Sequence, residues 1–208
     1  MVDENKSSSK LLSLMRKNNG FLKTSDVTAA GISRETLRLF VLKNNLNRVA
    51  RGVYASSECW DDEWFYVASS CKEIIYSGET ALYLHGLMQR EPFYTSVTVK
   101  YGYNARNLLK RGFKVTTTIK EKFYLGKTSI VTPYGNIVPV YDLDRTICDV
   151  ICHKDRMDVE VFRYAIREYM SSPKKNLNNL FKYAKALRVD DLVRVYTEVM
   201  IWLNPQIS

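Results

Sequence analysis

The chain has few of the residues on which catalytic and metal sites depend, and it has no long apolar run. Among its 208 residues are 2 histidines and 4 cysteines (Cys59, Cys71, Cys148 and Cys152). No apolar run approaches the ~20 residues that a membrane-spanning helix needs, and the polar start MVDENKSSSK lacks the apolar core of a signal peptide. We therefore expect a protein of the reducing cytoplasm, with neither a disulfide framework nor a membrane anchor.

Several motifs of catalytic or metal sites are absent or incomplete. Cys148, Cys152 and His153 lie close together in the sequence, but the chain lacks the paired CxxC ligands of a structural zinc site, so core cysteines are the better interpretation. Gly126-Lys127-Thr128 resembles the end of a phosphate-binding loop, but Glu121 stands where that loop requires glycine. A Gly-x-Ser-x-Gly motif is missing as well. The sequence therefore predicts a protein without enzymatic activity, metal or cofactor.

Positive charge is abundant and is concentrated near the N-terminus. The whole chain has 31 Lys and Arg against 22 Asp and Glu, a formal net charge of +9. Residues 1–57 hold 10 basic and 4 acidic residues, whereas residues 58–208 hold 21 and 18. A basic first quarter indicates contact with the phosphates of a nucleic acid, where binding gains from counterion release. A solvated basic surface without a partner is the alternative.

Residues 24–44 predict two short helices joined by a glycine turn. Thr24 or Ser25 offers a side-chain oxygen to the free N–H groups at the start of the first helix. Gly31 ends this helix, because glycine reaches the left-handed conformation without a steric penalty. Ser33 then caps a second helix, from Arg34 to about Asn44. This succession is typical of a helix-turn-helix, whose second helix enters the major groove of DNA.

The second helix and the residues after it carry groups suited to DNA. Its outward face carries Arg34, Thr36, Arg38 and Lys43, and the planar fork of arginine can pair with guanine O6 and N7. The following residues predict two short strands, with Arg48 on the first and Arg51-Gly52 at the hairpin tip. Together these features predict a winged helix-turn-helix. An ordinary helical hairpin with a solvated basic face is the alternative.

The rest of the chain predicts strands and helices that succeed one another. Strands are expected where polar and apolar side chains alternate, at 94–100, 113–119, 128–131 and 136–140. Helices are expected at 61–73, 81–87, 104–110, 142–152, 159–170, 177–187 and 192–202. His85 lies among apolar residues, which favours a hydrogen-bonded structural role over a role as ligand or base.

The predicted fold class is α+β with two domains. A helix capped by Ser8 or Ser9, after a frayed tail at residues 1–7, is expected to support the second helix of the helix-turn-helix. Residues 1–57 form the winged helix-turn-helix domain, and the junction lies at 56–58. Residues 58–208 form a mixed α/β C-terminal domain with a small sheet and a helical tail.

The order of these parts resembles a known family. The segments TSDVTAAGISRETLRLFVLKNNLNRVARGVY, SGETALYLHGL and VPVYDLDRTICDVI, with the strands between the last two, are similar to the AbiEi family of bacterial abortive-infection antitoxins. The LHGL helix and the D-x-x-R-T-x-x-D pattern of Asp142, Arg145, Thr146 and Asp149 make this resemblance more specific than the winged helix alone.

The resemblance implies a type IV antitoxin, encoded beside a nucleotidyltransferase-like toxin of the AbiEii type. Its N-terminal domain would repress its own operon by binding inverted repeats in the promoter, with self-association on the DNA. Its C-terminal domain would neutralise the toxin without a stable complex, although no motif indicates through which residues. The DNA-binding role falls on Lys23, Thr24, Ser25, Ser33, Arg34, Thr36, Arg38, Arg48 and Arg51.

Each of these residues has an expected place on the DNA. Arg34, Thr36 and Arg38 would meet base edges, Lys23 and Ser25 would hold phosphates, and Arg48 with Arg51 would lie in or beside the minor groove. Three other functions stay open at this point. They are a stand-alone repressor whose second domain senses a ligand, an antitoxin that binds its toxin stably, and RNA binding by the basic surface.

Overall fold

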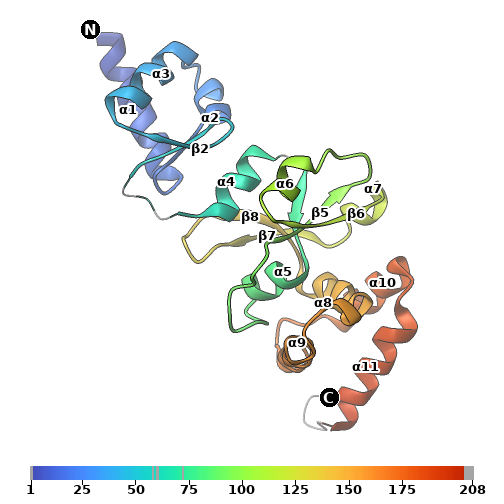
Figure 1. Cartoon of the computed structure of the whole chain (residues 1–208). Helices are drawn as coiled ribbons and strands as arrows, with labels where there is room; N and C mark the ends of the chain where they lie inside the picture. Colours follow the sequence, from blue (N-terminus) through green and yellow to red (C-terminus); the bar gives the residue numbers. More distant parts are fainter. Residues whose placement is uncertain (1, 58, 60, 72, 204–208) are drawn as a thin grey trace. The chain divides into compact units, whose positions relative to one another are not determined.

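The chain folds into two compact units that both contain helices and strands, so its fold class is α+β, as predicted. The computed structural model describes residues 2–57, 59, 61–71 and 73–203 (Figure 1). Unit 1 comprises residues 1–72 and 131–138, and unit 2 comprises residues 73–130 and 139–208. The expected junction at 56–58 includes residue 58, which lies outside the described residues. The division into domains 1–57 and 58–208 therefore stays a prediction.

Unit 1 consists of helices around a small sheet (Figure 1). Its elements are α1 (Val2–Lys17), β1 (Phe21–Lys23), α2 (Thr24–Ala29), α3 (Arg34–Lys43), β2 (Asn47–Ala50), β3 (Val53–Ala55) and α4 (Glu63–Ser70). The three strands are antiparallel, in the order β1-β3-β2. The apolar faces of α1, α2 and α3 meet in one core, which includes Leu11, Val27, Leu37 and Phe40. As predicted, α1 therefore supports α3.

Two predictions about helix starts in unit 1 are wrong. Helix α1 begins at Val2 and not after Ser8 or Ser9, so the described part of the expected tail is helical. Helix α2 has no side-chain cap. The backbone N–H of Thr24 donates to the carbonyl of Gly52 at 2.8 Å, so the neighbouring hairpin satisfies this group.

A buried carboxylate holds part of a distant hairpin within unit 1. Asp62 is fully buried and caps α4 by accepting from the N–H of Phe65 at 3.0 Å. Its other oxygen accepts from the hydroxyl of Thr132 at 2.6 Å and from the amide of Asn136 at 2.9 Å. Asn19 also donates to the carbonyl of Gly135 at 2.9 Å. The turn at 131–138 is therefore an integral part of unit 1.

Unit 2 has a five-stranded sheet and a layer of helices that end the chain (Figure 1). Its elements are β4 (Ile74–Tyr76), α5 (Gly78–Leu84), β5 (Ser96–Lys100), α6 (Arg106–Lys110), β6 (Lys114–Thr118), α7 (Lys120–Phe123), β7 (Lys127–Val131), β8 (Ile137–Tyr141), α8 (Leu143–Cys152), the 3₁₀ turn η1 (Lys154–Arg156), α9 (Val159–Ser171), α10 (Leu177–Leu187) and α11 (Asp190–Leu203). The turn between β7 and β8 counts with unit 1.

The centre of this sheet is a strand that the sequence indicates only as a short apolar stretch. The strand order is β6-β5-β4-β8-β7, in which β4 pairs antiparallel with β5 and parallel with β8. All three residues of β4 are buried. A strand buried on both faces lacks the alternation of polar and apolar residues by which the other strands are predicted.

The helical layer of unit 2 has one large apolar core. Side chains of α5, α8, α9, α10 and α11 contribute to it, among them Leu82, Ile147, Ile166, Leu180 and Val193. This is the helical tail that the sequence predicts, with α11 beginning at Asp190, two residues earlier than expected.

Candidate nucleic-acid interface

Helix α3 is fixed by a cap at its start and by two apolar residues on its inner side. The hydroxyl of Ser33 accepts from the N–H of Thr36 at 3.1 Å and lies 2.9 Å from the Thr36 hydroxyl. Leu37 and Phe40 are buried in the core. The cap matches the prediction. However, Ser33 and Thr36 already bond each other, so their first role is to begin the helix.

Arg34 and Arg38 lie on the exposed side of α3 and differ in whether their side chains have a partner. Both guanidinium groups are exposed, and Arg34 has no hydrogen bond or ion pair within the described part of the chain. Arg38 forms a forked ion pair with Glu35, with its Nη2 2.7 Å from a carboxylate oxygen. This hydrogen bond lowers the pKa of Glu35 and raises that of Arg38. For Arg38 to contact DNA, a base or phosphate would have to replace the Glu35 carboxylate as the partner of its guanidinium group.

The residues expected to hold phosphates cluster around one carboxylate. Lys23 Nζ lies 3.4 Å from Asp26 and 5.3 Å from the ring centroid of Phe65. The Ser25 hydroxyl donates to the other oxygen of Asp26 at 3.2 Å, and the Asn18 amide donates to Asp26 at 3.0 Å. The structure thus brings Lys23 and Ser25 together, but around Asp26.

The hairpin of β2 and β3 presents two free arginines. Arg51 and Gly52 form its tip, with a φ of +73° at Gly52, where glycine is the residue without steric penalty. A side chain there would also meet the Thr24 hydroxyl at 3.3 Å. Arg48 pairs with Tyr54 across the strands. Arg48 and Arg51 are exposed, and neither has a hydrogen bond or ion pair among the described residues.

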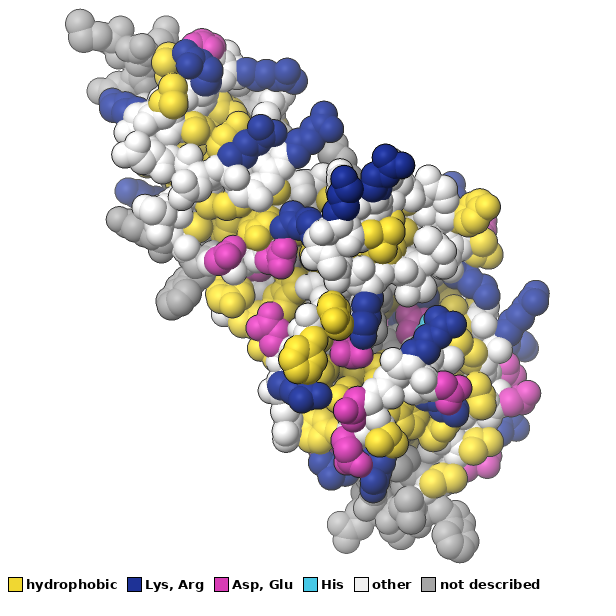
Figure 2. Space-filling model, viewed as in Figure 1, with side chains coloured by type: hydrophobic (Ala, Val, Ile, Leu, Met, Phe, Trp, Pro, Cys, Tyr) yellow, Lys and Arg dark blue, Asp and Glu magenta, His cyan; other side chains and the backbone are white. Residues whose placement is uncertain are grey.

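One feature of this surface was not predicted. Glu35 and Asp26 each bind a cation at i, i+3 spacing, a signal that the sequence contains. Lys43, on the last turn of α3, is exposed, as expected of a residue on the outward face, but it is not among the residues predicted to bind DNA. In Figure 2, dark blue side chains are spread over the visible face of unit 1, with few magenta ones.

The D-x-x-R-T-x-x-D pattern has a structural role in unit 2. Asp142 caps α8, and Arg145 is buried with its Nε 3.0 Å from Asp149. Nη1 of Arg145 donates to the carbonyls of Lys122 and Leu125 at 2.7 and 2.8 Å. Burial raises the pKa of Asp142 and of Asp149. The pattern therefore joins α8 to the segment between α7 and β7.

The histidine and cysteines fit structural roles in part. His85 Nε2 donates to the carbonyl of Tyr141 at 2.7 Å, as expected of a structural histidine, and burial lowers its pKa. Cys148 is buried as predicted, but Cys152 is exposed, so its prediction as a core residue is wrong. It is the last residue of α8 and follows Ile151, the last buried residue of that helix. Within the described ranges, no cluster of three or more His, Cys, Asp or Glu could hold a metal ion.

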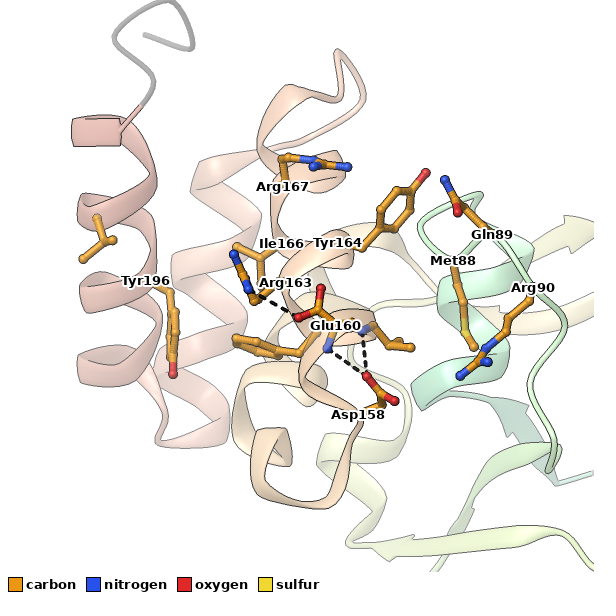
Figure 3. Close-up of a pocket in the computed structure, with 13 residues that line it drawn as sticks. Met88, Gln89, Arg90, Asp158, Glu160, Arg163, Tyr164, Ile166, Arg167 and Tyr196 are labelled. Atoms are coloured by element: carbon orange, nitrogen blue, oxygen red, sulfur yellow. Dashed lines mark hydrogen bonds and ion pairs between the residues drawn. The ribbon is translucent and has the colours of Figure 1, made fainter.

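A pocket in unit 2 lies along α9 (Figure 3). Its volume is about 880 Å³, and side chains of α9, α11 and residues 88–90 line it. Asp158 caps α9, and Glu160 pairs with Arg163 at 3.3 Å. Figure 3 shows Tyr164 directed toward the loop that carries Gln89. Arg163 lies on the opposite side of α9, toward α11. Because these polar groups already have partners or diverge, the pocket does not favour one ligand.

Comparisons with known proteins agree with the arrangement of unit 1. The family model described as "Transcriptional regulator, AbiEi antitoxin" matches residues 9–57. No curated protein matches the chain. The fold is similar to the "Crystal structure of RV2827C protein from Mycobacterium tuberculosis", with a TM-score of 0.56 at 11% sequence identity, over 86% of this chain and 71% of that chain. At this identity the likeness concerns the fold alone.

Among the described residues, no helix is both long and apolar enough to cross a membrane. Over residues 9–57 the chain thus matches the AbiEi antitoxin family of transcriptional regulators, which confirms the resemblance that the sequence indicates.

Proposed function

We propose that residues 1–57 are a winged helix-turn-helix that binds duplex DNA and represses the chain's own operon. The observation that carries this proposal is a set of exposed arginines on α3 and on the β2–β3 hairpin that have no ion-pair partner among the described residues: Arg34, Arg48 and Arg51. A capped helix with a free arginine in its first turn suits base readout, and arginines on a neighbouring hairpin suit the minor groove. The family match over the same residues supports the same role.

Each predicted residue has a part in this proposal. Arg34 and, after release from Glu35, Arg38 contact base edges. Lys23, Thr24 and Ser25 lie at the phosphate backbone, and Ser33 and Thr36 hold the start of α3 against the DNA. Arg48 and Arg51 enter or flank the minor groove. Inverted repeats would bring two copies onto one operator, because the symmetry of such sites matches paired half-sites.

The proposal extends to the antitoxin role of the family. Unit 2 would neutralise a nucleotidyltransferase-like toxin encoded beside this chain, without a stable complex, and the protein would work beside the chromosome in the cytoplasm. Co-expression of the chain with that toxin tests this part. We expect growth to be restored while affinity-tagged toxin brings down none of the chain. A stable complex would contradict the type IV mechanism, and continued toxicity would contradict the antitoxin role.

The DNA-binding part is tested by fluorescence anisotropy with the DNA upstream of the chain's gene. We expect Arg34→Ala combined with Arg38→Ala to weaken binding by at least tenfold, because one base contact contributes about 1–3 kcal/mol. The matched control is Arg156→Ala combined with Arg163→Ala, which removes the same charge from unit 2. Equal loss in both double variants, or no loss in either, would contradict the assignment of α3 as the reading helix.

A further inference from the structure

A second basic segment lies in unit 2, apart from the proposed DNA-binding residues. Residues 96–130 contain eight Lys or Arg (Lys100, Arg106, Lys110, Arg111, Lys114, Lys120, Lys122 and Lys127) and a single acid, Glu121. The rest of unit 2 is close to neutral or acidic. In Figure 2, dark blue side chains gather near α6 on the visible face of this unit. The net positive charge of unit 2 thus comes from this segment.

Part of this segment combines lysines with exposed tyrosines. Lys100 Nζ donates to the Tyr124 hydroxyl at 3.1 Å and lies 5.3 Å from the centroid of its ring. Lys127 Nζ lies 5.8 Å from the same ring. Tyr101 follows Lys100, and its backbone N–H donates to the carbonyl of Thr118 at 2.8 Å. The C-terminal ends of β5 and β6 thus meet the α7–β7 connection at one edge of the sheet.

Both tyrosines present a large part of their surface to solvent. Tyr101 is 85% exposed and Tyr124 is 48% exposed. Lys100 also pairs with Glu73, whereas the exposed Lys120 and Lys127 have no carboxylate partner among the described residues. Aromatic rings beside free lysines are the means by which proteins bind unpaired nucleotides, because bases stack on the rings while phosphates meet the cations.

We propose that Lys100, Tyr101, Lys120, Tyr124 and Lys127, the Tyr101–Tyr124 surface, bind a single-stranded stretch of nucleic acid. Bases stack on Tyr101 and Tyr124, and the lysines neutralise the phosphates between them. Duplex DNA fits this surface less well, because its base faces are already stacked and cannot reach an exposed ring. An anionic membrane also fits less well, because α6 and α7 have only five and four residues and form no amphipathic helix of useful length.

This inference goes beyond the proposed function and stands on different residues. The test therefore uses the full chain with Arg34, Arg38, Arg48 and Arg51 all replaced by alanine, so that binding through unit 1 does not contribute. The probes are fluorescein-labelled U15 and dT15, followed by anisotropy at several salt concentrations. Binding of both probes supports a surface that recognises nucleic acid through base stacking and charge. Preference for one of them supports it too, since the two probes differ only in the sugar and in the methyl group of thymine.

Tyrosine variants provide the decisive comparison. We expect Tyr101→Ala combined with Tyr124→Ala to weaken binding of the better probe at least tenfold, since one stacked base contributes ~1–3 kcal/mol. Tyr101→Phe combined with Tyr124→Phe should keep binding within about twofold, because the ring is retained. The matched control is Phe93→Ala combined with Tyr94→Ala, which removes two rings that are 83% and 54% exposed elsewhere in unit 2. We expect that control to bind as tightly as its parent.

Three results would overturn the proposal. The first is no binding of either probe at 0.1 M salt. The second is a loss of binding in the Phe93 and Tyr94 control equal to that in the tyrosine variant. The third is binding of a labelled duplex, or of vesicles with anionic lipid, that is tighter than that of U15 and dT15 and equally sensitive to the tyrosine changes.

Discussion

Two carboxylates set the availability of the cations on unit 1. Glu35 holds Arg38 in a forked ion pair, and Asp26 lies at the centre of contacts from Lys23, Ser25 and Asn18. Both acids lie beside groups proposed to meet DNA, so they oppose phosphates in two ways. They occupy the cations, and they add negative charge next to the DNA. The exposed pair of Glu35 and Arg38 contributes little to stability, so a ligand can replace Glu35 there.

Replacing Glu35 tests this opposition directly. We expect Glu35→Gln to tighten binding to the upstream DNA about two- to fivefold, because Arg38 becomes free and one negative charge is removed. Titration of the labelled duplex by anisotropy gives the ratio. Glu168→Gln is the matched control, since Glu168 also pairs with an exposed arginine, Arg167, but on α9. Unchanged or weaker binding by Glu35→Gln would show that Arg38 does not contact the DNA.

At the scale of elements, one buried aspartate connects α4 with the turn between β7 and β8. Asp62 accepts three hydrogen bonds, from the Phe65 N–H, the Thr132 hydroxyl and the Asn136 amide. The turn lies ~70 residues further along the chain than the helix that holds it, as the sequence separation of these partners shows. Removal of the Asp62 carboxylate would leave these buried donors without a partner, which lowers the stability of the fold by more than the loss of the hydrogen bonds alone.

Asp62→Ala should therefore destabilise the protein by about 2–4 kcal/mol, as judged from chemical denaturation followed by circular dichroism. Asp61→Ala is the control, because Asp61 is the exposed neighbour of Asp62 and has the same charge. Its effect should stay below about 0.5 kcal/mol. A similar small effect for Asp62→Ala would mean that the turn at 131–138 does not depend on this carboxylate.

Elements with a local signal could be predicted from the sequence. The Ser33 cap and the Gly31 turn predicted the start of α3 at Arg34, and the predicted end near Asn44 lies one residue past its last residue, Lys43. The same holds for α8 to α10, whose apolar stripes have helical spacing. The missing cap of α2 could not be predicted, because its substitute is the carbonyl of Gly52 on a different element.

The residues of the candidate site could be predicted from the sequence, but which of its cations are free and which are paired could not. The sequence places basic residues on α3 and on the hairpin, and the structure has Arg34, Arg48 and Arg51 exposed there. Whether a cation is free depends on side-chain geometry, as with Arg38 and Glu35. The central strand β4 and the link from Asp62 to Thr132 were missed for a related reason. They depend on contacts between residues distant in sequence.

At the scale of the whole molecule, positive charge is divided between two segments. Residues 1–57 carry a net charge of +6 and residues 96–130 carry +7, whereas residues 58–95 hold two basic and seven acidic residues. The two basic segments belong to different compact units. This division predicts two separable, salt-sensitive binding activities, one for duplex DNA and the other for unpaired nucleotides.

The most direct test of the central claim is the salt dependence of binding to the upstream duplex. For the unchanged chain, log Kd plotted against log salt concentration should have a steep slope, near 0.9 per phosphate contact. The variant with Arg34, Arg38, Arg48 and Arg51 replaced by alanine should bind at least a hundredfold more weakly and with a slope shallower by about two to four contacts. If the two proteins gave the same affinity and slope, unit 1 would not be the DNA-binding part of this chain.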